Sequence, residues 1–501
     1  MPNPIATAPR DRLLQAGMSE FRLLREHAYV DGGWCEAESG ARLAVFNPAT
    51  GEMVGHVPNL GPEEAKKAIA AAARALHSWR RFQAIERGER LRRWAELMRF
   101  HRAELSFIMT LEQGKPLSEA AGEVDYAASF LDWFAAEGER LDGEVLTSHL
   151  AARRLFSFRV PVGVSVAITP WNFPSAMITR KAGAALAAGC TMIVRPASET
   201  PFSALALAAL AEEAGIPPGV FSVLTGDPEP FAQVVMEEPA VRQISFTGST
   251  RVGRLLAAQA ASTVKRVALE LGGHAPMIIR ADADVDIAVA GAVAAKFQTS
   301  GQDCLAANRI FVARPLYEAF CRRFADMVDR LIVGDGLDEG VQIGPLINEA
   351  AVARCRRQVE DALAKGARLL TRRQQAELGP NFFAPGVLAD VTPDMDIFCE
   401  ETFGPLAAVL PFDEDKDAVR LANETEYGLA AYLFGRDVSA LWRMGEALDY
   451  GMVAFNTVKM TGPPVPFGGV KQSGLGREGS RHGIHEYTEL KYFCIAGLTH
   501  D

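Results

Sequence analysis

The sequence predicts an α/β protein in which two successive units are each built on a sheet of mostly parallel strands. Short apolar segments alternate with amphipathic helical patterns between residues 155 and 271, and a second alternation of this kind begins after Pro276. Such alternation is typical of parallel sheets that are covered by helices on both faces. At 501 residues, the chain is also too long for one ordinary hydrophobic core. We therefore expect two or three domains.

The residues before the first unit predict an extension, two hairpins and a group of helices. Residues 1–20 lack the apolar core of a signal peptide, so we interpret them as an N-terminal extension and expect no export. Residues 29–54 alternate apolar stretches with turn residues, which predicts hairpin strands. The helical spacing of apolar residues predicts helices from Pro62 to Trp79, at 87–113 and at 117–141. We interpret these helices as structural.

The first α/β unit repeats a strand followed by a helix. Strands are expected at 162–168, 191–194, 221–224, 243–246 and 266–269, with helices at 175–188, 204–214, 231–236 and 252–260. Ligand sites in parallel sheets lie at the carboxyl ends of the strands. The residues that follow each strand are therefore the first candidates for a functional site.

Three of these strand ends carry polar residues with a chemical use. Asn172 follows the first strand between two prolines, and its amide could bind an oxyanion, although a turn asparagine more often satisfies the local backbone. Gly248 and Ser249 open a helix whose N-terminus attracts phosphate, although many helices begin with such a cap. Glu270 ends an apolar strand, where burial would raise its pKa and fit it for general base catalysis.

The second unit contains a cysteine in an unusual setting. Strands are expected at 277–279, 310–312 and 406–410, and helices at 316–331 and 349–365. Cys304 follows Ser-Gly-Gln-Asp on a tight polar turn, between a helix at 289–297 and the strand at 310–312. A thiol at such a junction can meet a ligand, whereas most single cysteines are inert packing residues. A glycine-rich loop at 466–478 precedes a final strand at 490–494.

Composition excludes several functional classes. The net charge of −10 argues against a nucleic-acid binder, and no apolar stretch approaches the ~20 residues of a membrane span. The seven cysteines are scattered without a CxxC pair, which fits a reducing cytoplasm without disulfides. The nine histidines form no ligand pair, so we predict no metal chemistry. We expect a cytoplasmic protein that binds neither nucleic acid nor membrane.

Six ordered motifs resemble those of the aldehyde dehydrogenase superfamily. They lie at 169–174, 246–253, 269–273, 301–304, 400–405 and 467–469, and the likeness extends over nearly the whole chain from about residue 25. Within the superfamily the likeness is greatest to bacterial succinate-semialdehyde dehydrogenases, through residues 178–181, 269–276 and 474–487.

The resemblance implies a Rossmann-like cofactor domain, an α/β catalytic domain and a small β element for oligomerisation. The implied divisions are 1–20 for the extension, 21–140 and 160–271 for the cofactor domain, 272–474 for the catalytic domain, and 141–159 with 475–501 for oligomerisation. A homodimer or homotetramer is the expected assembly.

The resemblance also implies a mechanism and a role for individual residues. Cys304 would attack the aldehyde, Asn172 and the backbone N–H of Cys304 would hold the oxyanion, and Glu270 would activate water against the thioester. Lys181 would support this site. Glu401 would bind the nicotinamide ribose, with Phe403 against the ring and Ser249 on the pyrophosphate. Further cofactor contacts are implied at Thr169, Pro170, Trp171, Gly248 and Leu271.

Two residues near the expected adenosine ribose depart from the family pattern. Arg195 stands where the family usually has lysine, and Ser198 replaces the glutamate of NAD-preferring members. A glutamate would repel a 2′-phosphate, whereas a guanidinium can bind it bidentately. We therefore expect NADP+ as the preferred cofactor, with NAD+ as the alternative.

The substrate site departs from the family pattern as well. Similar succinate-semialdehyde enzymes hold the distal carboxylate with two arginines and a serine; Arg180 matches the first arginine and Thr461 the serine, but Gln298 replaces the second arginine. Phe173 and Phe467 are the other implied substrate contacts. The expected substrate is a small acidic semialdehyde such as succinate semialdehyde, with glutarate or sulfonated semialdehydes as alternatives.

Two further functional classes stay open on sequence grounds. One is a relative that passes the thioester to coenzyme A, against which Glu270 argues because a hydrolytic base competes with thiol capture. The other is a non-catalytic binding protein on the same fold. Ala306 stands two residues after Cys304, where some relatives carry a second cysteine, so no disulfide switch is expected.

Overall fold

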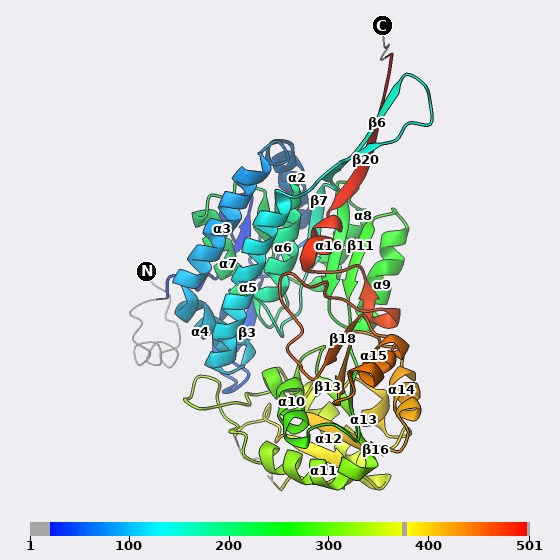
Figure 1. The fold of residues 1–501 in the computed structure, drawn as a ribbon. Coiled ribbons are helices and arrows are strands. Elements are labelled where there is room, and N and C mark those ends of the chain that lie inside the picture. Colours follow the sequence, from blue (N-terminus) through cyan, green and yellow to red (C-terminus); the bar gives the residue numbers. More distant parts are fainter. Residues whose placement is uncertain (1–20, 373–377, 498–501) are drawn as a thin grey trace.

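The computed structural model describes residues 21–372 and 378–497 (Figure 1). The extension expected at 1–20 lies outside the described residues. The α/β fold is confirmed: two large sheets, each dominated by parallel strands, make up the body of the protein. The domain boundaries inferred above stay predictions.

The first sheet has eight strands in the order β19-β11-β10-β7-β8-β9-β1-β2. Its parallel centre consists of β7 (Val164–Ile168), β8 (Thr191–Arg195), β9 (Phe221–Val223), β10 (Val241–Thr247) and β11 (Arg266–Glu270). Antiparallel strands complete both edges: β1 (Ala28–Val30) and β2 (Gly33–Cys35) on one side, and β19 (Gly474–Leu475) on the other. The five central strands lie where the sequence predicted them: β8, β10 and β11 are longer than expected by one to three residues, and β7 and β9 are shorter by two and one.

Helices cover both faces of this sheet because its central strands are apolar on both sides. One face packs against α3 (Ala84–Phe100), α4 (Arg102–Gln113), α5 (Leu117–Gly138), α6 (Ala176–Ala188) and α7 (Pro201–Glu213). The other face packs against α2 (Pro62–Trp79), α8 (Pro228–Glu237) and α9 (Thr250–Ala261). The helix expected at 87–113 is two helices, because His101 leaves the helical conformation and caps both α3 and α4.

The second sheet has seven strands in the order β14-β15-β16-β13-β12-β17-β18. They are β12 (Ala275–Ile279), β13 (Ala307–Ala313), β14 (Arg368–Leu369), β15 (Gly386–Ala389), β16 (Leu406–Phe412), β17 (Ala430–Phe434) and β18 (Met452–Phe455). Only β14 is antiparallel to its neighbour. The helices of this unit are α10 (Val285–Phe297), α11 (Arg314–Val328), α12 (Glu349–Ala364), α13 (Asp396–Cys399), α14 (Asp415–Asn423) and α15 (Val438–Ala447).

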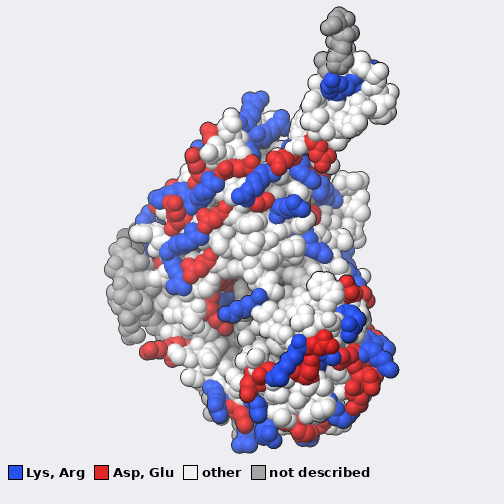
Figure 2. Space-filling view, viewed as in Figure 1, with Lys and Arg blue, Asp and Glu red and all other residues white. Residues whose placement is uncertain are grey.

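A narrow arm projects from the body (Figure 1). It is a three-stranded antiparallel sheet of β5 (Glu144–Leu146), β6 (Arg153–Pro161) and β20 (Thr488–Ala496). In the chain, β20 follows the short helix α16 (Ser480–His485). Figure 2 shows both signs of charge mixed over the body, whereas the visible face of the arm is mostly white, with Lys and Arg side chains near its tip. A separate hairpin pairs β3 (Arg42–Phe46) with β4 (Met53–Pro58). Among the described residues, no helix is long and apolar enough to cross a membrane.

Candidate active site

One cavity of about 370 Å³ is lined by residues at the carboxyl ends of strands in the first sheet and by loops that precede strands in the second sheet. The first sheet contributes the turns after β7, β10 and β11, and the second contributes the loops before β13 and β16. The sequence-predicted residues on its wall are Pro170, Trp171, Asn172, Gly248, Ser249, Glu270, Leu271, Cys304, Glu401 and Phe403. The structure therefore brings together residues that are up to 233 positions apart in the chain, from 170 to 403.

Cys304 lies in a loop with an unusual backbone. After α10, a short 3-10 turn at Gln298–Gly301 holds Thr299 and Ser300 at φ of 49° and 56°. Gly301 follows at φ 72°, and a Cβ there would lie 2.2 Å from the carbonyl oxygen of Gly404. The tight polar turn expected from the sequence is thus confirmed, and close packing of the backbone holds it in place.

The thiol of Cys304 is 8% exposed. Burial raises its pKa well above the ordinary value, and the nearby Glu270 carboxylate acts in the same direction. In the free protein the sulfur therefore carries its proton at neutral pH. A base close to the cavity is needed to generate the thiolate, which is the nucleophilic form.

Glu270 ends β11 and is 3% exposed. Within the described part of the chain, neither of its carboxylate oxygens has a hydrogen-bond partner. Burial, followed by repulsion from Glu478, raises the pKa of this carboxyl to about 8. A buried, unsatisfied carboxylate at the wall of a cavity is costly to maintain, which is the expected setting of a general base.

Asn172 lies opposite, in the turn between β7 and α6, and is 4% exposed. Its Nδ2 donates to the carbonyl oxygen of Gln302 over 3.1 Å, and its Oδ1 accepts from the backbone N–H of Phe173. The side-chain amide thus faces the nucleophile loop. This hydrogen bond places the neutral Asn172 amide beside Gln302, two residues before Cys304.

The two cations predicted on α6 share one buried partner that the sequence analysis did not single out. Lys181 Nζ contacts Thr247 Oγ1 at 2.7 Å and also the Glu478 carboxylate. Arg180 contacts the other oxygen of Glu478 at 2.8 Å, and its guanidinium lies 4.0 Å from the centre of the Phe467 ring. Both cations are 1% exposed at the side chain. The pKa of Glu478 is lowered because these two charges outweigh its burial.

The residues expected to bind substrate differ in their surroundings. Nε of Arg180 is buried without a hydrogen-bond partner among the described residues, so the guanidinium keeps one donor for an anion beside its ion pair with Glu478. Burial raises the pKa of Tyr126, while Arg180 and a hydrogen bond with Thr461 oppose this shift. Thr461 and Gln298 are themselves exposed, and Phe173 is half-buried with Lys115 over its ring.

The cofactor half of the cavity contains a second buried carboxylate. Glu401 Oε1 accepts from the backbone N–H of Gly273 at 3.0 Å, and burial raises the pKa of Glu401 to about 7. The ring of Phe403 meets that of Trp171 edge-on at 5.5 Å. Arg354, which the sequence analysis missed, donates to the carbonyl oxygens of Thr402 and Phe403 and so holds this segment.

A groove of about 840 Å³ lies beside α8 and α9 and is lined by Arg195. The Arg195 guanidinium donates to Ser198 Oγ and to the carbonyl oxygen of Gly226, both at 2.7 Å. Its Nε is buried without a partner among the described residues. Ser249 caps α9 by accepting from Val252, while Thr169 is buried at the end of β7. These groups fit a dinucleotide, because helix N-termini and guanidinium groups both bind phosphate.

Comparison with known proteins places the chain among the oxidoreductases, and it belongs to the aldehyde dehydrogenase family. The family model for "Aldehyde dehydrogenase family" matches residues 34–493. The chain is 53% identical to a non-phosphorylating aspartate-semialdehyde dehydrogenase of Halomonas elongata, over 96% of this chain and 98% of that one. It is 52% identical to an NADP+ succinate-semialdehyde dehydrogenase of Escherichia coli, over 95% and 99%.

Solved structures give the same result. The crystal structure of succinate-semialdehyde dehydrogenase from Burkholderia pseudomallei superimposes with a TM-score of 0.95 at 53% identity. The similarity covers 96% of this chain and 100% of that one. The fold and the family that the six motifs indicated are therefore confirmed.

Proposed function

We propose that this protein oxidises a small acidic semialdehyde to the carboxylic acid with NADP+ or NAD+ as the hydride acceptor. The observation that supports this most directly is the shared cavity of Cys304, Glu270 and Asn172, into which Glu401 and Ser249 also face. One wall thus offers a nucleophile, a base and an oxyanion donor, and the other offers groups suited to a dinucleotide.

The reaction begins at the sulfur of Cys304. Once the thiol has given its proton to solvent water, the thiolate adds to the aldehyde carbon, and the Asn172 amide with the backbone N–H of Cys304 stabilises the oxyanion of the thiohemiacetal. NAD(P)+, when bound, would accept the hydride, and Cys304 would then hold the acyl group as a thioester. Glu270 then takes a proton from water, the hydroxide attacks the thioester carbon, and the thiolate leaves with release of the acid.

The charges of Lys181, Arg180 and Glu478 influence the pKa of the base Glu270. Glu478 raises the pKa of Glu270 while the two cations lower it, so the three charges together set the pH at which the base works. Arg180 is our candidate for the distal carboxylate of the substrate, because its guanidinium lies against Phe467 and its buried Nε donor is unused. The relatives named for succinate and aspartate semialdehyde make acidic semialdehydes the first class to test.

The test is a panel of aldehydes scored by reduced-cofactor absorbance with each nucleotide. Succinate, aspartate, glutarate and sulfonated semialdehydes are compared with uncharged aldehydes of equal length. We expect turnover with acidic substrates, greater kcat/KM with NADP+, and loss of activity in Cys304→Ala. Turnover of uncharged aldehydes alone would remove the role given to Arg180.

Transfer of the acyl group to coenzyme A is separated from hydrolysis by analysis of the product. We expect the free acid in both the presence and the absence of coenzyme A, because Glu270 provides the base for hydrolysis. An acyl-coenzyme A product would refute the hydrolytic reaction.

A further inference from the structure

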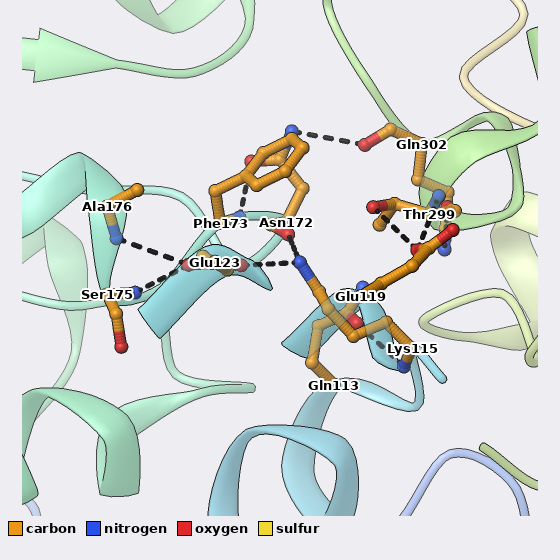
Figure 3. A network of polar contacts seen from close by, with 10 residues as sticks. All are labelled: Gln113, Lys115, Glu119, Glu123, Asn172, Phe173, Ser175, Ala176, Thr299 and Gln302. Atoms are coloured by element: carbon orange, nitrogen blue, oxygen red, sulfur yellow. Dashed lines mark hydrogen bonds and ion pairs between the residues drawn. The ribbon is translucent and has the colours of Figure 1, made fainter. Parts of the chain in front are cut away.

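The segment between α4 and α5 makes contacts that a purely structural role does not require. Lys115 Nζ lies 2.6 Å from Glu123 Oε2 and 2.6 Å from the carbonyl oxygen of Asn172, and both charged side chains are 1% exposed (Figure 3). The ammonium group also lies 4.3 Å from the centre of the Phe173 ring. Lys115 thus contacts two consecutive residues of the turn that carries the oxyanion amide.

Glu123 holds the same turn from its other end. Its second oxygen, Oε1, accepts from the backbone N–H groups of Ser175 and Ala176, at 2.9 and 3.2 Å. These are the first free N–H groups of α6, so a carboxylate is favoured there by the helix dipole. The Lys115–Glu123 pair therefore fixes the turn at the Asn172 carbonyl and at the start of α6.

The nucleophile loop is attached to the same helix. Glu119, one turn before Glu123 on α5, accepts from the backbone N–H of Thr299 at 2.9 Å. Gln302 in turn accepts from the Asn172 amide and, with its side chain, from the N–H of Ile347. In Figure 3, Glu119 and Glu123 point from one helix toward the two segments that carry the nucleophile and the oxyanion donor.

A buried ion pair is a poor source of stability, because the loss of hydration offsets most of the attraction between the charges. What such a pair does well is to fix atoms in one arrangement, since both partners lose their hydrogen bonds if either moves. Oxyanion donors depend on such fixation, because a displacement of about 1 Å can cost roughly 100-fold in rate.

We propose that Lys115 and Glu123 are positioning residues that hold the Asn172 amide at the oxyanion, an inference that rests on the proposed dehydrogenase function. They touch neither the aldehyde nor the cofactor. Their effect on the reaction passes through the backbone of the Asn172 turn.

The test uses the full-length protein with Lys115→Met, Glu123→Gln and the Lys115→Met/Glu123→Gln pair, in which neither partner of the ion pair is left charged without the other. Three quantities are measured: the rate of the first-turnover burst of reduced cofactor, the Kd of the reduced cofactor by its fluorescence, and the rate of iodoacetamide labelling at Cys304 by peptide mass mapping. We expect the burst to slow by at least tenfold, while cofactor affinity and Cys304 labelling stay within twofold of wild type.

Glu112 provides a matched control. It is fully buried and accepts from the backbone N–H groups of Phe202 and Ser203, at 2.7 and 2.8 Å, at the start of α7. It therefore makes the same pair of contacts as Glu123, but to a helix whose first residues do not line the cavity. Glu112→Gln should leave the burst rate within twofold, whatever it does to thermal stability.

A double-mutant cycle with Asn172→Ala separates positioning from a general loss of structure. If Lys115 acts through the Asn172 amide, Lys115→Met should slow the burst by less than twofold when Asn172 is already alanine. Independent, multiplying effects would overturn the inference, and so would an unchanged burst in the folded charge-free pair. A wild-type protein that oxidises no aldehyde would instead refute the proposed function itself.

Discussion

In the reaction that we propose, hydrolysis depends on Glu270, whose pKa is raised to about 8 by burial and by Glu478. A general base acts only when deprotonated, so hydrolysis of the thioester should accelerate with rising pH and level off above about pH 8. Below that pH the ionised fraction, and with it the rate, should fall about tenfold per pH unit. The measurement is the deacylation rate between pH 5.5 and 9.5.

Glu270→Gln is the matched variant for this profile, because it keeps the shape of the side chain and removes the titration. The burst of reduced cofactor should remain, and the later steady-state rate should fall at least 100-fold and lose its dependence on pH between 6 and 9. If the steady-state rate of Glu270→Gln rises with pH as it does in wild type, another group is the base.

Ser198 is where we expect the choice between the two nucleotides to be made. Its hydroxyl accepts a hydrogen bond from Arg195, whose remaining buried Nε has no partner among the described residues. Ser198→Glu would pair with this guanidinium and repel a 2′-phosphate. Because a hydrogen bond to a charged group contributes about 1.5–3 kcal/mol, kcat/KM for NADP+ should fall roughly 10- to 100-fold. Steady-state kinetics with both nucleotides gives the ratio.

Ser198→Ala is the control, since it removes the hydroxyl without adding a charge. Its effect on kcat/KM for NADP+ should be a few-fold at most. Equal losses in both variants would show that the hydroxyl, rather than charge, determines the preference.

At the scale of single residues, the sequence pointed to reactive groups at strand ends and at one turn. Asn172 and Glu270 were candidates because they follow strands of a parallel sheet, and Cys304 was a candidate because it lies on a polar turn between a helix and a strand. Glu478 and Lys115 could not, because their importance depends on partners 297 and 57 residues away. A lysine between glycine and proline, or an acid in a glycine-rich loop, has no local pattern that distinguishes it from a turn residue.

Among the elements, the two-residue strand β19 holds the end of β11, which carries Glu270. It pairs Gly474 with Glu270 and Leu475 with Leu269, and so fixes the end of β11. A Cβ at Gly474 would lie 1.9 Å from the carbonyl oxygen of Leu269, at φ 134°. Gly474→Ala should therefore separate β19 from β11, displace Glu270 and remove most of the activity. Thermal unfolding and turnover measure the two effects.

Gly215→Ala is the matched control for this prediction. Gly215 also has a positive φ, of 77°, but no atom lies within 4 Å of the position of its Cβ. It should cost only the backbone strain of about 1–2 kcal/mol and leave kcat unchanged. If both variants lose the same stability and the same activity, β19 does not fix the base.

The long elements were predictable from the sequence and the short ones were not. The strands β7 to β11 are short, largely apolar stretches separated by helical patterns, so their type and position in the chain could be inferred, whereas their order along the sheet was not predicted. β19 and the break at His101 had no such pattern. Their conformation follows from pairing with β11 and from packing of α3 and α4 against α5, which are tertiary effects.

For the whole molecule, the exposed apolar side chains of the arm are the feature that a single chain does not explain. Leu490 and Tyr492 on β20 and Val145 on β5 are 65%, 53% and 76% exposed. An exposed antiparallel sheet with apolar side chains is costly in water and prone to pair with another chain. We therefore expect the arm to be covered by a second copy of this chain, in a closed assembly with an even number of subunits.

Leu490→Glu with Tyr492→Glu places two carboxylates on the same face of β20, because side chains two residues apart in a strand point the same way. Light scattering after size exclusion should show an oligomer for wild type and a monomer for this variant. Leu363→Glu is the control, since Leu363 is an exposed leucine on α12, 44% accessible and outside the arm. It should leave the oligomer intact, whereas dissociation by both variants, or by neither, would mean that the arm does not form the interface.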